Sequence, residues 1–229
     1  MAVLGLYQPS LLGGGDPAID SDVPILRHWL DKTSWVDTAA GWLRGPDTLL
    51  VDLAELLSWT RGRRRMYDRM VDDPRLSATC EVGAAGTPAI LGSMATALEG
   101  RYGERLHAVW VNYYRDGQDS VAWHSDHVGR TQRQPLVAIV TLGGPRRFLV
   151  RPRGGGRSHG FAPASGDLLV MGGDCQHNWE HTIPKAKAAP PRMSVTFRHH
   201  SQPTRAAVEP ERPTAAARTG SARRVLPQS

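Results

Sequence analysis

The sequence predicts a mainly β, α+β fold, in which an all-β sandwich or barrel carries N-terminal helices packed on one face. Two segments in the first half of the chain repeat apolar residues at helical spacing. After residue 105, short runs rich in β-branched and aromatic residues follow one another, separated by Gly, Pro and Asp clusters. No long helical pattern interrupts these runs. We therefore expect the strands to pair with one another rather than to alternate with helices.

The N-terminal segment, residues 1–45, shows no clear period, and glycines at positions 13 to 15 interrupt it. We expect an irregular extension that packs on the domain through aromatic side chains. These side chains are Trp29, Trp35 and Trp42.

Residues 46–105 contain two predicted helices with a basic segment between them. The first helix begins at Pro46, and its apolar positions are Leu49, Leu50, Leu53, Leu56 and Leu57. The second helix spans residues 88–102 and ends at Gly103. Its apolar stripe consists of Ile90, Leu91, Met94 and Leu98. The basic segment between the helices is RGRRRMYDR, residues 61–69.

Residues 106–200 form the predicted β domain. Its strand-like runs are residues 107–115, 135–143, 146–152, 166–173 and 191–199. The remaining residues, 201–229, are rich in Ala, Arg and Pro and lack periodicity. We expect them to be a disordered basic tail.

The charge and the cysteine content of the chain indicate which kind of partner it binds and in which cellular compartment it lies. The formal net charge is +6 and the isoelectric point is about 9.8, which favours an anionic partner, nucleic acid first. Residues 203–229 carry five arginines and two glutamates, so the rest of the chain is only mildly basic. Two cysteines, Cys80 and Cys175, argue against a disulfide framework or a thiolate metal cage. The sequence has no run of about 18 apolar residues, so we expect no membrane segment. We also expect a cytoplasmic protein and a monomer.

The segment VAWHSDHVG, residues 121–129, places His124 and Asp126 two positions apart. On a strand, such residues point to the same face, so an imidazole and a carboxylate can bind one ion. A third ligand must come from elsewhere, and the candidates are His159, His177, His181, His199 and His200. We favour His181 in the stretch NWEHTIP, with His177 as its rival. Two histidines and one carboxylate with open positions are typical of non-haem Fe(II) oxygenases.

Such an oxygenase commonly uses 2-oxoglutarate, a dicarboxylate whose binding needs a buried arginine. The run PRMSVTFRH has Arg192 and Arg198 on one face, roughly 20 Å apart, which is too far for both to bind one carboxylate. We expect one of them to hold the distal carboxylate and the other to lie near the far end of the pocket. In VNYYR, Asn112 and Tyr114 share a face, about 7 Å apart. If the two runs pair antiparallel with Tyr114 beside Arg192, then Asn112 lies beside Ser194.

The motifs NYYRDGQDSVAWHSD, HTIP and RMSVTFR together resemble the AlkB family of Fe(II)/2-oxoglutarate dioxygenases, which repair alkylated nucleic-acid bases. The resemblance covers about residues 107–199. It implies a double-stranded β-helix, or jelly roll, with iron on His124, Asp126 and His181. It also implies a set of 2-oxoglutarate-binding side chains, namely Asn112, Tyr114, Arg192 and Arg198, with Ser194 beside them. The implied reaction consumes O2 and releases an aldehyde, succinate and CO2 together with the repaired base.

The resemblance also places a nucleotide-recognition lid in the basic segment 61–69. A base inside a duplex cannot reach buried iron, so we expect a flipped-out or single-stranded base. We predict that Tyr67 stacks on this base. Phosphate contact or lid support is expected from Arg63, Arg64 and Arg65. Trp123 lines either the cavity or the core, and Arg130 and Arg133 could extend the binding face. The expected partner is alkylated DNA, with RNA as an alternative.

Several alternatives stay open at this point. Relatives often carry an acidic residue shortly after the His-x-Asp motif, where this chain has Val128. Either Asp119 or Asp68 supplies that charge, or the base preference differs. A 2-oxoglutarate-dependent hydroxylase or demethylase of a small molecule or protein would share the iron and 2-oxoglutarate residues. A non-catalytic nucleic-acid-binding module is a third possibility, against which the intact triad argues. By strand alternation, His127 should point away from the metal.

Overall fold

The computed structural model describes residues 8–9, 13–66, 69–106, 108–126 and 135–199, without the side chains of residues 64–66 and 69–71. The predicted tail at 201–229 lies outside these residues. Within them the chain forms fifteen strands and three helices, so the prediction of a mainly β fold is confirmed.

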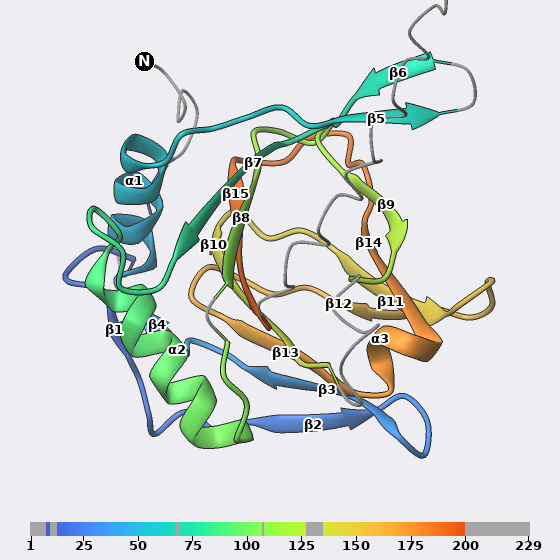
Figure 1. Cartoon of the computed structure of the whole chain (residues 1–229), viewed down its shortest axis with the longest axis horizontal. Coiled ribbons are helices and arrows are strands. Elements are labelled where there is room, and N and C mark those ends of the chain that lie inside the picture. The colour runs from blue at the N-terminus through green and yellow to red at the C-terminus, as the bar shows by residue number, and fades with distance from the viewer. Residues whose placement is uncertain (1–7, 10–12, 67–68, 107, 127–134, 200–229) are drawn as a thin grey trace, which may run out of the picture.

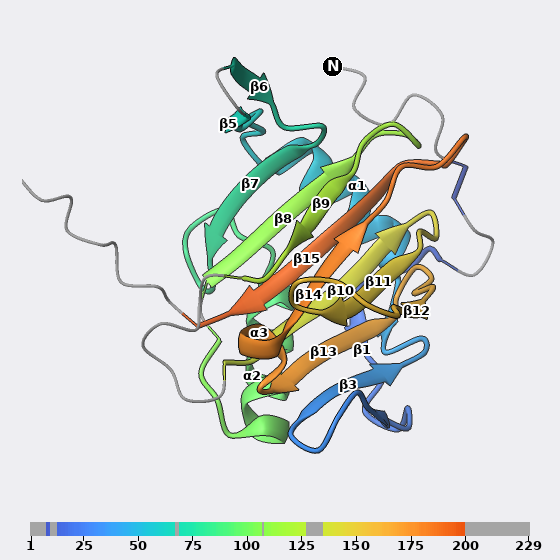
Figure 2. The same cartoon turned by 90° about the vertical axis from the view of Figure 1, so that its right-hand side faces the viewer.

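Two antiparallel sheets face each other and enclose the middle of the molecule (Figure 1). The larger sheet consists, in spatial order, of β2 (Leu26–Trp29), β3 (Ser34–Ala39), β13 (Leu168–Gly173), β10 (Val137–Gly143), β15 (Arg192–Arg198), β8 (Ala108–Tyr114) and β7 (Leu76–Glu81). The smaller sheet consists of β12 (His159–Phe161), β11 (Phe148–Pro152), β14 (Trp179–Ile183) and β9 (Val121–His124). Figure 2 shows strands of the larger sheet running side by side. Two opposed sheets of this kind are the predicted jelly-roll core.

Strands in the middle of the larger sheet are buried on both faces. On β10, Ala138 and Val140 pack toward the helices, while Val137 and Ile139 pack toward the smaller sheet. All seven residues of β10 are buried. This double burial explains why its sequence, VAIVTLG, is continuously apolar instead of alternating.

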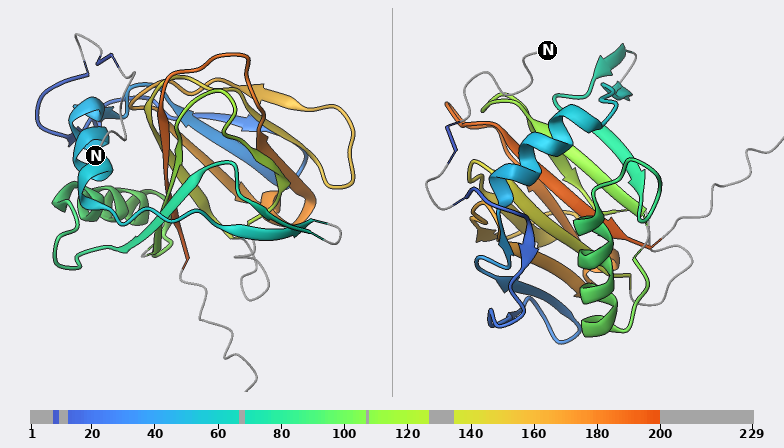
Figure 3. Two further views of the ribbon diagram at one scale, coloured as in Figure 1. Left: turned by 90° about the horizontal axis from the view of Figure 1, so that it is seen from above. Right: turned by 90° about the vertical axis from the view of Figure 1, so that its left-hand side faces the viewer.

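Helices α1 (Pro46–Leu56) and α2 (Ala89–Tyr102) cover the outer face of the larger sheet (Figure 3, right). Both were predicted, but α1 ends at Leu56, which is 57% exposed, and Leu57 has extended backbone. The predicted apolar stripe is therefore wrong at Leu56, whereas Leu57, just beyond the helix, is partly buried and packs against the core. The side chains that α1 buries completely are Leu49, Leu50 and Leu53. Gly103 ends α2 as predicted, because its φ of 72° belongs to the left-handed region and its N–H bonds to the Glu99 carbonyl.

Residues 18–44 of the N-terminal segment form strands, so our expectation of an irregular extension was wrong for this part. Strand β2 pairs with β3, and β3 pairs with β13, so both extend the larger sheet. The pattern was obscured because β3 buries a charge: Asp37 is 1% exposed and accepts two hydrogen bonds from Arg27. Strand β2 is exposed at all its positions, including Trp29. Trp42 is buried against the helices, as expected.

Smaller elements complete the fold. They are β1 (Ala18–Ile19), which pairs with β4 (Leu43–Arg44), the hairpin of β5 (Arg63–Met66) and β6 (Arg69–Asp72), and the short helix α3 (Cys175–Asn178). The β5–β6 hairpin projects from the body of the molecule near the start of β7 (Figure 1). Across the described ranges, the helices are all too short or too polar to span a bilayer.

Candidate active site

The smaller sheet brings the three predicted metal ligands together. His124 ends β9 and lies opposite His181 of β14 in the antiparallel register, with a bulge following this pair. Asp126 lies two residues beyond the end of β9, and its carboxylate Oδ2 is 3.8 Å from His181 Nε2. One possible ligand atom from each residue lies within 4.8 Å of the others. Such a set of two imidazoles and one carboxylate fits a divalent transition metal and leaves coordination positions open.

Each of the two histidines can turn a ring nitrogen toward the metal. His124 Nδ1 lies 2.8 Å from the Ala122 carbonyl oxygen, which can only accept, so Nδ1 carries the proton and Nε2 remains free to coordinate. Burial, reinforced by the neighbouring His124, lowers the pKa of His181 to about 3. His181 is therefore neutral at physiological pH and need not lose a proton to bind a metal.

Asp126 is held in place although it lies outside a strand. Its backbone N–H donates a hydrogen bond to Oε1 of Gln176 on α3, at 3.0 Å. Gln176 is 3% exposed, and its carbonyl oxygen accepts a hydrogen bond from Arg153, which also donates to the Ser125 hydroxyl. The segment that carries the carboxylate is thus tied to the helix that precedes β14. Sequence reasoning missed Gln176, because only the fold places α3 beside this segment.

The other wall of the site comes from β8 and β15 of the larger sheet. These strands pair antiparallel with Tyr114 opposite Arg192 and Asn112 opposite Ser194, which is the register considered from the sequence. A cavity reaches from the metal triad to this wall. Its lining includes Asn112, Tyr114, Ser194 and Arg198 together with the apolar Ile139, Phe148 and Ile183.

The two arginines of β15 occupy different ends of this arrangement. Arg198 Nη1 is 3.2 Å from Asp126 Oδ1, so Arg198 lies at the metal end. Arg192 is completely buried, and its two terminal nitrogens donate to the hydroxyls of Ser194, at 2.6 Å, and Thr141, at 3.1 Å. Burial lowers the pKa of Arg192 to about 10, which leaves the guanidinium charged at neutral pH. The Nε atoms of both arginines are buried and have no hydrogen-bond partner among the described residues.

Arg75 is a further cation at the cavity that sequence reasoning missed. Its Nε donates to the Asn112 side-chain oxygen at 3.0 Å, and the Ser77 hydroxyl donates to the same oxygen at 3.0 Å. Because that oxygen accepts both bonds, the Asn112 amide NH2 is left to act as a donor elsewhere. Alternation along β7 could have indicated this site, since Arg75 and Ser77 are two residues apart, but β7 was not predicted as a strand.

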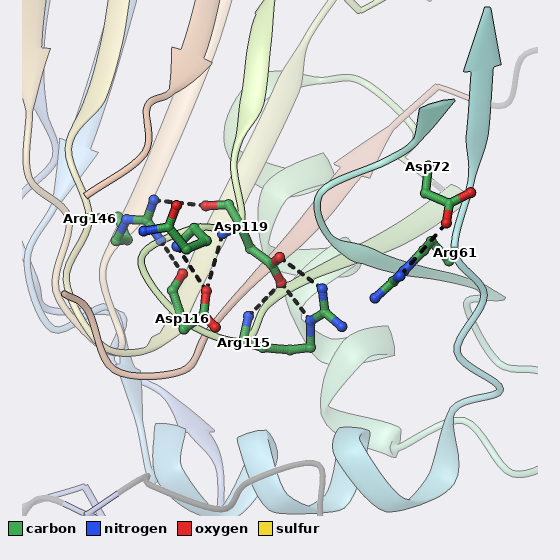
Figure 4. A network of polar contacts seen from close by, with 7 residues as sticks. Arg61, Asp72, Arg115, Asp116, Asp119 and Arg146 are labelled. Carbon is green, nitrogen blue, oxygen red and sulfur yellow. Dashed lines mark hydrogen bonds and ion pairs between the residues drawn. The ribbon is translucent and has the colours of Figure 1, made fainter. Parts of the chain in front are cut away.

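A polar clamp fixes the loop that leads into the metal-binding segment (Figure 4). Arg146 is 4% exposed and donates hydrogen bonds to the carbonyl oxygens of Asp116, Asp119 and Pro184. Arg115 donates two side-chain hydrogen bonds to the Asp119 carboxylate. The clamp therefore joins the turn before β9 to the segment after β14, and these two strands carry His124 and His181.

Asp119 is committed to this clamp and is not placed to recognise a base. Burial on its own raises the pKa of Asp119, but the hydrogen bonds from Arg115 outweigh burial and leave the pKa below its ordinary value. The suggestion that Asp119 supplies a negative charge for the substrate is therefore wrong. Asp68, the other suggestion, lies outside the described residues.

The competing histidines do not join the triad. His177 is exposed on α3, and His159 is exposed on β12, where its ring packs against Trp179. His199 is buried and accepts a hydrogen bond from the Leu136 backbone N–H. His127 and His200 lie outside the described residues.

The residues predicted to meet the substrate are only partly described. Arg63 on β5 is exposed and forms an ion pair with Asp72 at 3.3 Å, and Arg61 lies 3.8 Å from the same carboxylate (Figure 4). Trp123 stacks beneath the Arg151 guanidinium at 4.0 Å and is not among the cavity-lining side chains. Several predicted residues lie outside the described part of the chain, namely Tyr67, Val128, Arg130, Arg133 and the side chains of Arg64 and Arg65.

Comparison with known proteins gives a consistent set of matches. The sequence pattern of the 2OG-Fe(II) oxygenase superfamily matches residues 41–202. Human alpha-ketoglutarate-dependent dioxygenase alkB homolog 3 is 28% identical over 174 residues, which cover 66% of this chain and 60% of the human protein. DNA oxidative demethylase ALKBH2 of Arabidopsis thaliana is 28% identical over 184 residues, covering 62% and 58% of the two chains. The chain thus spans about 60% of the length of these curated relatives.

A solved structure shares the fold. The structure of OsALKBH1 superposes with a TM-score of 0.52 at 14% sequence identity, covering 76% of this chain and all of that chain. At this level of identity the similarity concerns the fold alone. It agrees with the two opposed sheets described above.

Proposed function

We propose that this chain, which belongs to the 2OG-Fe(II) oxygenase superfamily, is a dioxygenase of the AlkB type that oxidatively removes alkyl groups from damaged bases in DNA. The observation that carries this proposal is the cluster of His124, Asp126 and His181 beside a cavity lined by arginines. The superfamily accounts for Fe(II), 2-oxoglutarate and O2 as cofactor, co-substrate and oxidant. RNA remains the alternative nucleic acid.

The donor set fits the metal. In our proposal His124 and His181 offer ring nitrogens, and Asp126 offers a carboxylate oxygen. Their arrangement leaves coordination positions for a chelating co-substrate and for O2. When bound, Fe(II) supplies the oxidation of a C–H bond, and the protein positions the reactants and excludes water.

Side chains on β8 and β15 of the larger sheet can bind a dicarboxylate. We assign the distal carboxylate of 2-oxoglutarate to Arg192, which is buried and charged and has an unpaired Nε, with Tyr114 and Ser194 beside it. Burial raises the pKa of Tyr114, so its hydroxyl stays protonated and can donate. The Asn112 amide, oriented by Arg75, and Arg198 complete the set toward the metal.

The overall reaction balances without a further reagent. One N-methyl base, 2-oxoglutarate and O2 give the unmethylated base, formaldehyde, succinate and CO2. One oxygen atom enters succinate, and the other leaves with formaldehyde. The base must leave its stack to reach a cavity between two sheets, so we expect a flipped-out or single-stranded substrate. We assign its capture to the projecting β5–β6 hairpin, with Tyr67 and the arginines at 63 to 65 as contact residues.

We further propose that the protein is a cytoplasmic monomer. Cys80 and Cys175 are both free thiols, which suits a reducing compartment.

The proposal is tested by loading the full chain with Fe(II) and 2-oxoglutarate without oxygen, then adding O2 and a methylated single-stranded oligonucleotide. We expect a visible charge-transfer band before oxygen, then formaldehyde and succinate in equal amounts. His181→Ala should abolish all three signals, and His177→Ala, which alters an exposed histidine of the same region, should retain them. Succinate without formaldehyde would point instead to a small molecule or protein as substrate. Absence of the band in the wild-type protein would exclude every enzymatic assignment.

A further inference from the structure

The outer edge of β7 is open beyond Ser77. Strand β7 ends the larger sheet next to β8 (Figure 2). Ser77 and Thr60 exchange two backbone hydrogen bonds, so Ser77 turns its N–H and C=O away from β8. Because these directions alternate along an antiparallel strand, Thr79 turns its N–H and C=O to the same edge. Of the residues that the structure describes, Thr60 alone bridges this edge, so a further strand can pair from Thr79 onward.

A groove with a volume of about 650 Å³ follows this edge, and we call it the β7 groove. Its lining includes every residue from Ser77 to Glu81. Since side chains alternate between the two faces of a sheet, a groove that touches all of them follows the edge of the strand instead of one face. Leu56, at the end of α1, lines the groove from the helix side. Trp110 of β8, four residues before the inward-facing Tyr114, lines it from the side of the smaller sheet.

The β7 groove exposes apolar side chains on both of its sides. Leu56 is 57% exposed, and Trp110 is 41% exposed although the Arg198 guanidinium packs on its ring. Glu81 is the one charged side chain among the described residues that line the groove. An open strand edge flanked by exposed apolar side chains is a place where another strand can add. The groove therefore fits an extended segment that carries apolar side chains and a cation.

The chain itself reaches this edge after β15. Ala108 of β8 lies opposite Glu81 on one side and opposite Arg198 on the other. The last residue of β15 is thus two strand spacings, or about 10 Å, from Glu81. Residues 200–229 follow, and their attachment to the sheet gives them a high effective concentration at the groove.

One segment of the tail matches the groove. Residues 221–226, with the sequence SARRVL, contain two arginines and the apolar Val225 and Leu226, and no proline interrupts them. Their positive charge is opposite to that of Glu81. The rest of the tail fits less well, because prolines interrupt residues 203–213 and residues 214–220 lack a large apolar side chain.

We propose that residues 221–226 add to the open edge of β7 as an antiparallel strand, which makes the β7 groove a docking site for the chain's own tail. Arg224 then lies beside Glu81, and Leu226 lies beside Thr79. A segment of this composition does not fold alone, and the edge supplies the backbone partners that it needs. The inference concerns a surface outside the metal site and does not depend on the proposed function.

The side chains of this register match the two sides of the groove. Leu226 lies on the side of Trp110, because Trp110 is opposite Thr79 in the sheet. Val225 points to the other side, where Leu56 is exposed. Both exposed apolar side chains of the groove are thereby covered.

The register also accounts for where the added strand ends. Pro227 follows Leu226 and has no N–H to donate to a sheet. The next position along the edge, beside Ser77, is already occupied by Thr60. The docked segment therefore ends where the edge is no longer open.

Hydrogen–deuterium exchange of the full chain, read by mass spectrometry, tests this inference and needs neither Fe(II) nor 2-oxoglutarate. We expect the backbone N–H groups of Thr79 and of residues 221–226 to exchange about tenfold or more slowly in wild type than in Leu226→Asp. Val208→Asp is the matched control, since it places the same charge in the tail outside the docking segment. It should keep the protection of wild type.

A charge exchange tests the pairing of Arg224 with Glu81. Glu81→Arg should lower the protection of residues 221–226 about threefold or more, because attraction becomes repulsion. Adding Arg224→Glu should restore the protection. Adding Arg223→Glu should not, since alternation turns that side chain to the other side of the groove. Equal rescue by both would show a general charge attraction and contradict a paired strand.

The occupant of the groove follows from the conditions under which protection appears. Protection that is independent of protein concentration and is lost in Leu226→Asp supports docking of the chain's own tail. Protection that rises with protein concentration would assign the strand to a second copy. Protection of Thr79 only after addition of a single-stranded oligonucleotide would assign the groove to nucleic acid. Either of these results, or equal exchange in wild type and Leu226→Asp, overturns the inference.

Discussion

Arg192 is the residue on which 2-oxoglutarate binding should depend most. It is fully buried, keeps its charge, and its hydroxyl partners Ser194 and Thr141 leave its Nε unpaired. A buried cation of this kind is costly unless an anion completes its hydrogen bonds. The proposed co-substrate carboxylate would do so.

Replacing Arg192 by Gln should therefore raise the dissociation constant of 2-oxoglutarate about 30-fold or more, because a charge-assisted pair is lost. Anaerobic titration followed by the charge-transfer band measures this constant. Arg151→Gln is the matched control, since Arg151 pairs with Glu180 on the smaller sheet and does not line the cavity. An unchanged constant in Arg192→Gln would remove this arginine from the co-substrate site.

Gln176 should control iron affinity although it is not a ligand. Its side-chain oxygen accepts a hydrogen bond from the Asp126 backbone N–H, and Asp126 itself lies beyond the end of β9. Residues that orient metal ligands typically affect affinity 10- to 100-fold. We expect Gln176→Leu to weaken Fe(II) binding by about 10-fold or more, measured by anaerobic titration, with folding followed separately by circular dichroism.

Thr182→Val is the control for Gln176. Thr182 is buried, and its hydroxyl donates to the Val121 carbonyl, so this variant also removes a buried hydrogen bond near the metal site. It leaves the contact to Asp126 intact. Equal loss of iron affinity in both variants would show a general loosening of the sheet instead of a specific effect on the carboxylate.

At the scale of elements, the loop between β8 and β9 is the part most dependent on polar contacts. Arg146 bonds three carbonyl oxygens from two separate segments. Arg146→Met should lower the free energy of unfolding by roughly 2–4 kcal/mol, because one buried and two partly buried carbonyl acceptors lose their donor. Urea denaturation gives this value, and a change below about 1 kcal/mol would mean that the clamp contributes little.

Asp119 should make the same loop sensitive to acid. Its pKa in the folded protein lies below the unfolded value of about 3.9, so the folded state favours the ionised carboxylate. The stabilisation is therefore fully present above the unfolded pKa and is lost as pH falls through the folded pKa. Wild type should exceed Asp119→Asn in unfolding free energy at pH 7, and the difference should shrink below about pH 4. A difference independent of pH would contradict this assignment.

The sequence predicted elements best where burial left a simple pattern. The central strands β10 and β15, and both long helices, were found because packing on one or two faces imposes an apolar run or stripe. Strands β3 and β7 were missed. Asp37 is buried in β3 through its pairing with Arg27, and β7 lies at the sheet edge with small and polar residues. Local pattern cannot show a charge that is neutralised by a distant partner.

At the scale of the whole molecule, the site lies between two sheets whose strands are far apart in sequence. The triad and the Tyr114–Arg192 pairing followed from motifs and strand alternation, both of which are local. Gln176 and Arg75 were not identified, because their roles depend on how α3 and β7 come to lie beside the strands that carry the motifs. Long-range packing therefore accounts for most of what the motifs did not reveal.

The most direct test of the proposed activity is the intact mass of a single-stranded oligonucleotide with one N-methylated base, before and after incubation with the protein, Fe(II), 2-oxoglutarate and O2. We expect the strand to lose the mass of one methylene group, which converts N-methyl to N–H, and Asp126→Ala should leave the mass unchanged. An unchanged mass with wild-type protein that still converts 2-oxoglutarate to succinate would contradict base dealkylation. It would reassign the same site to another substrate.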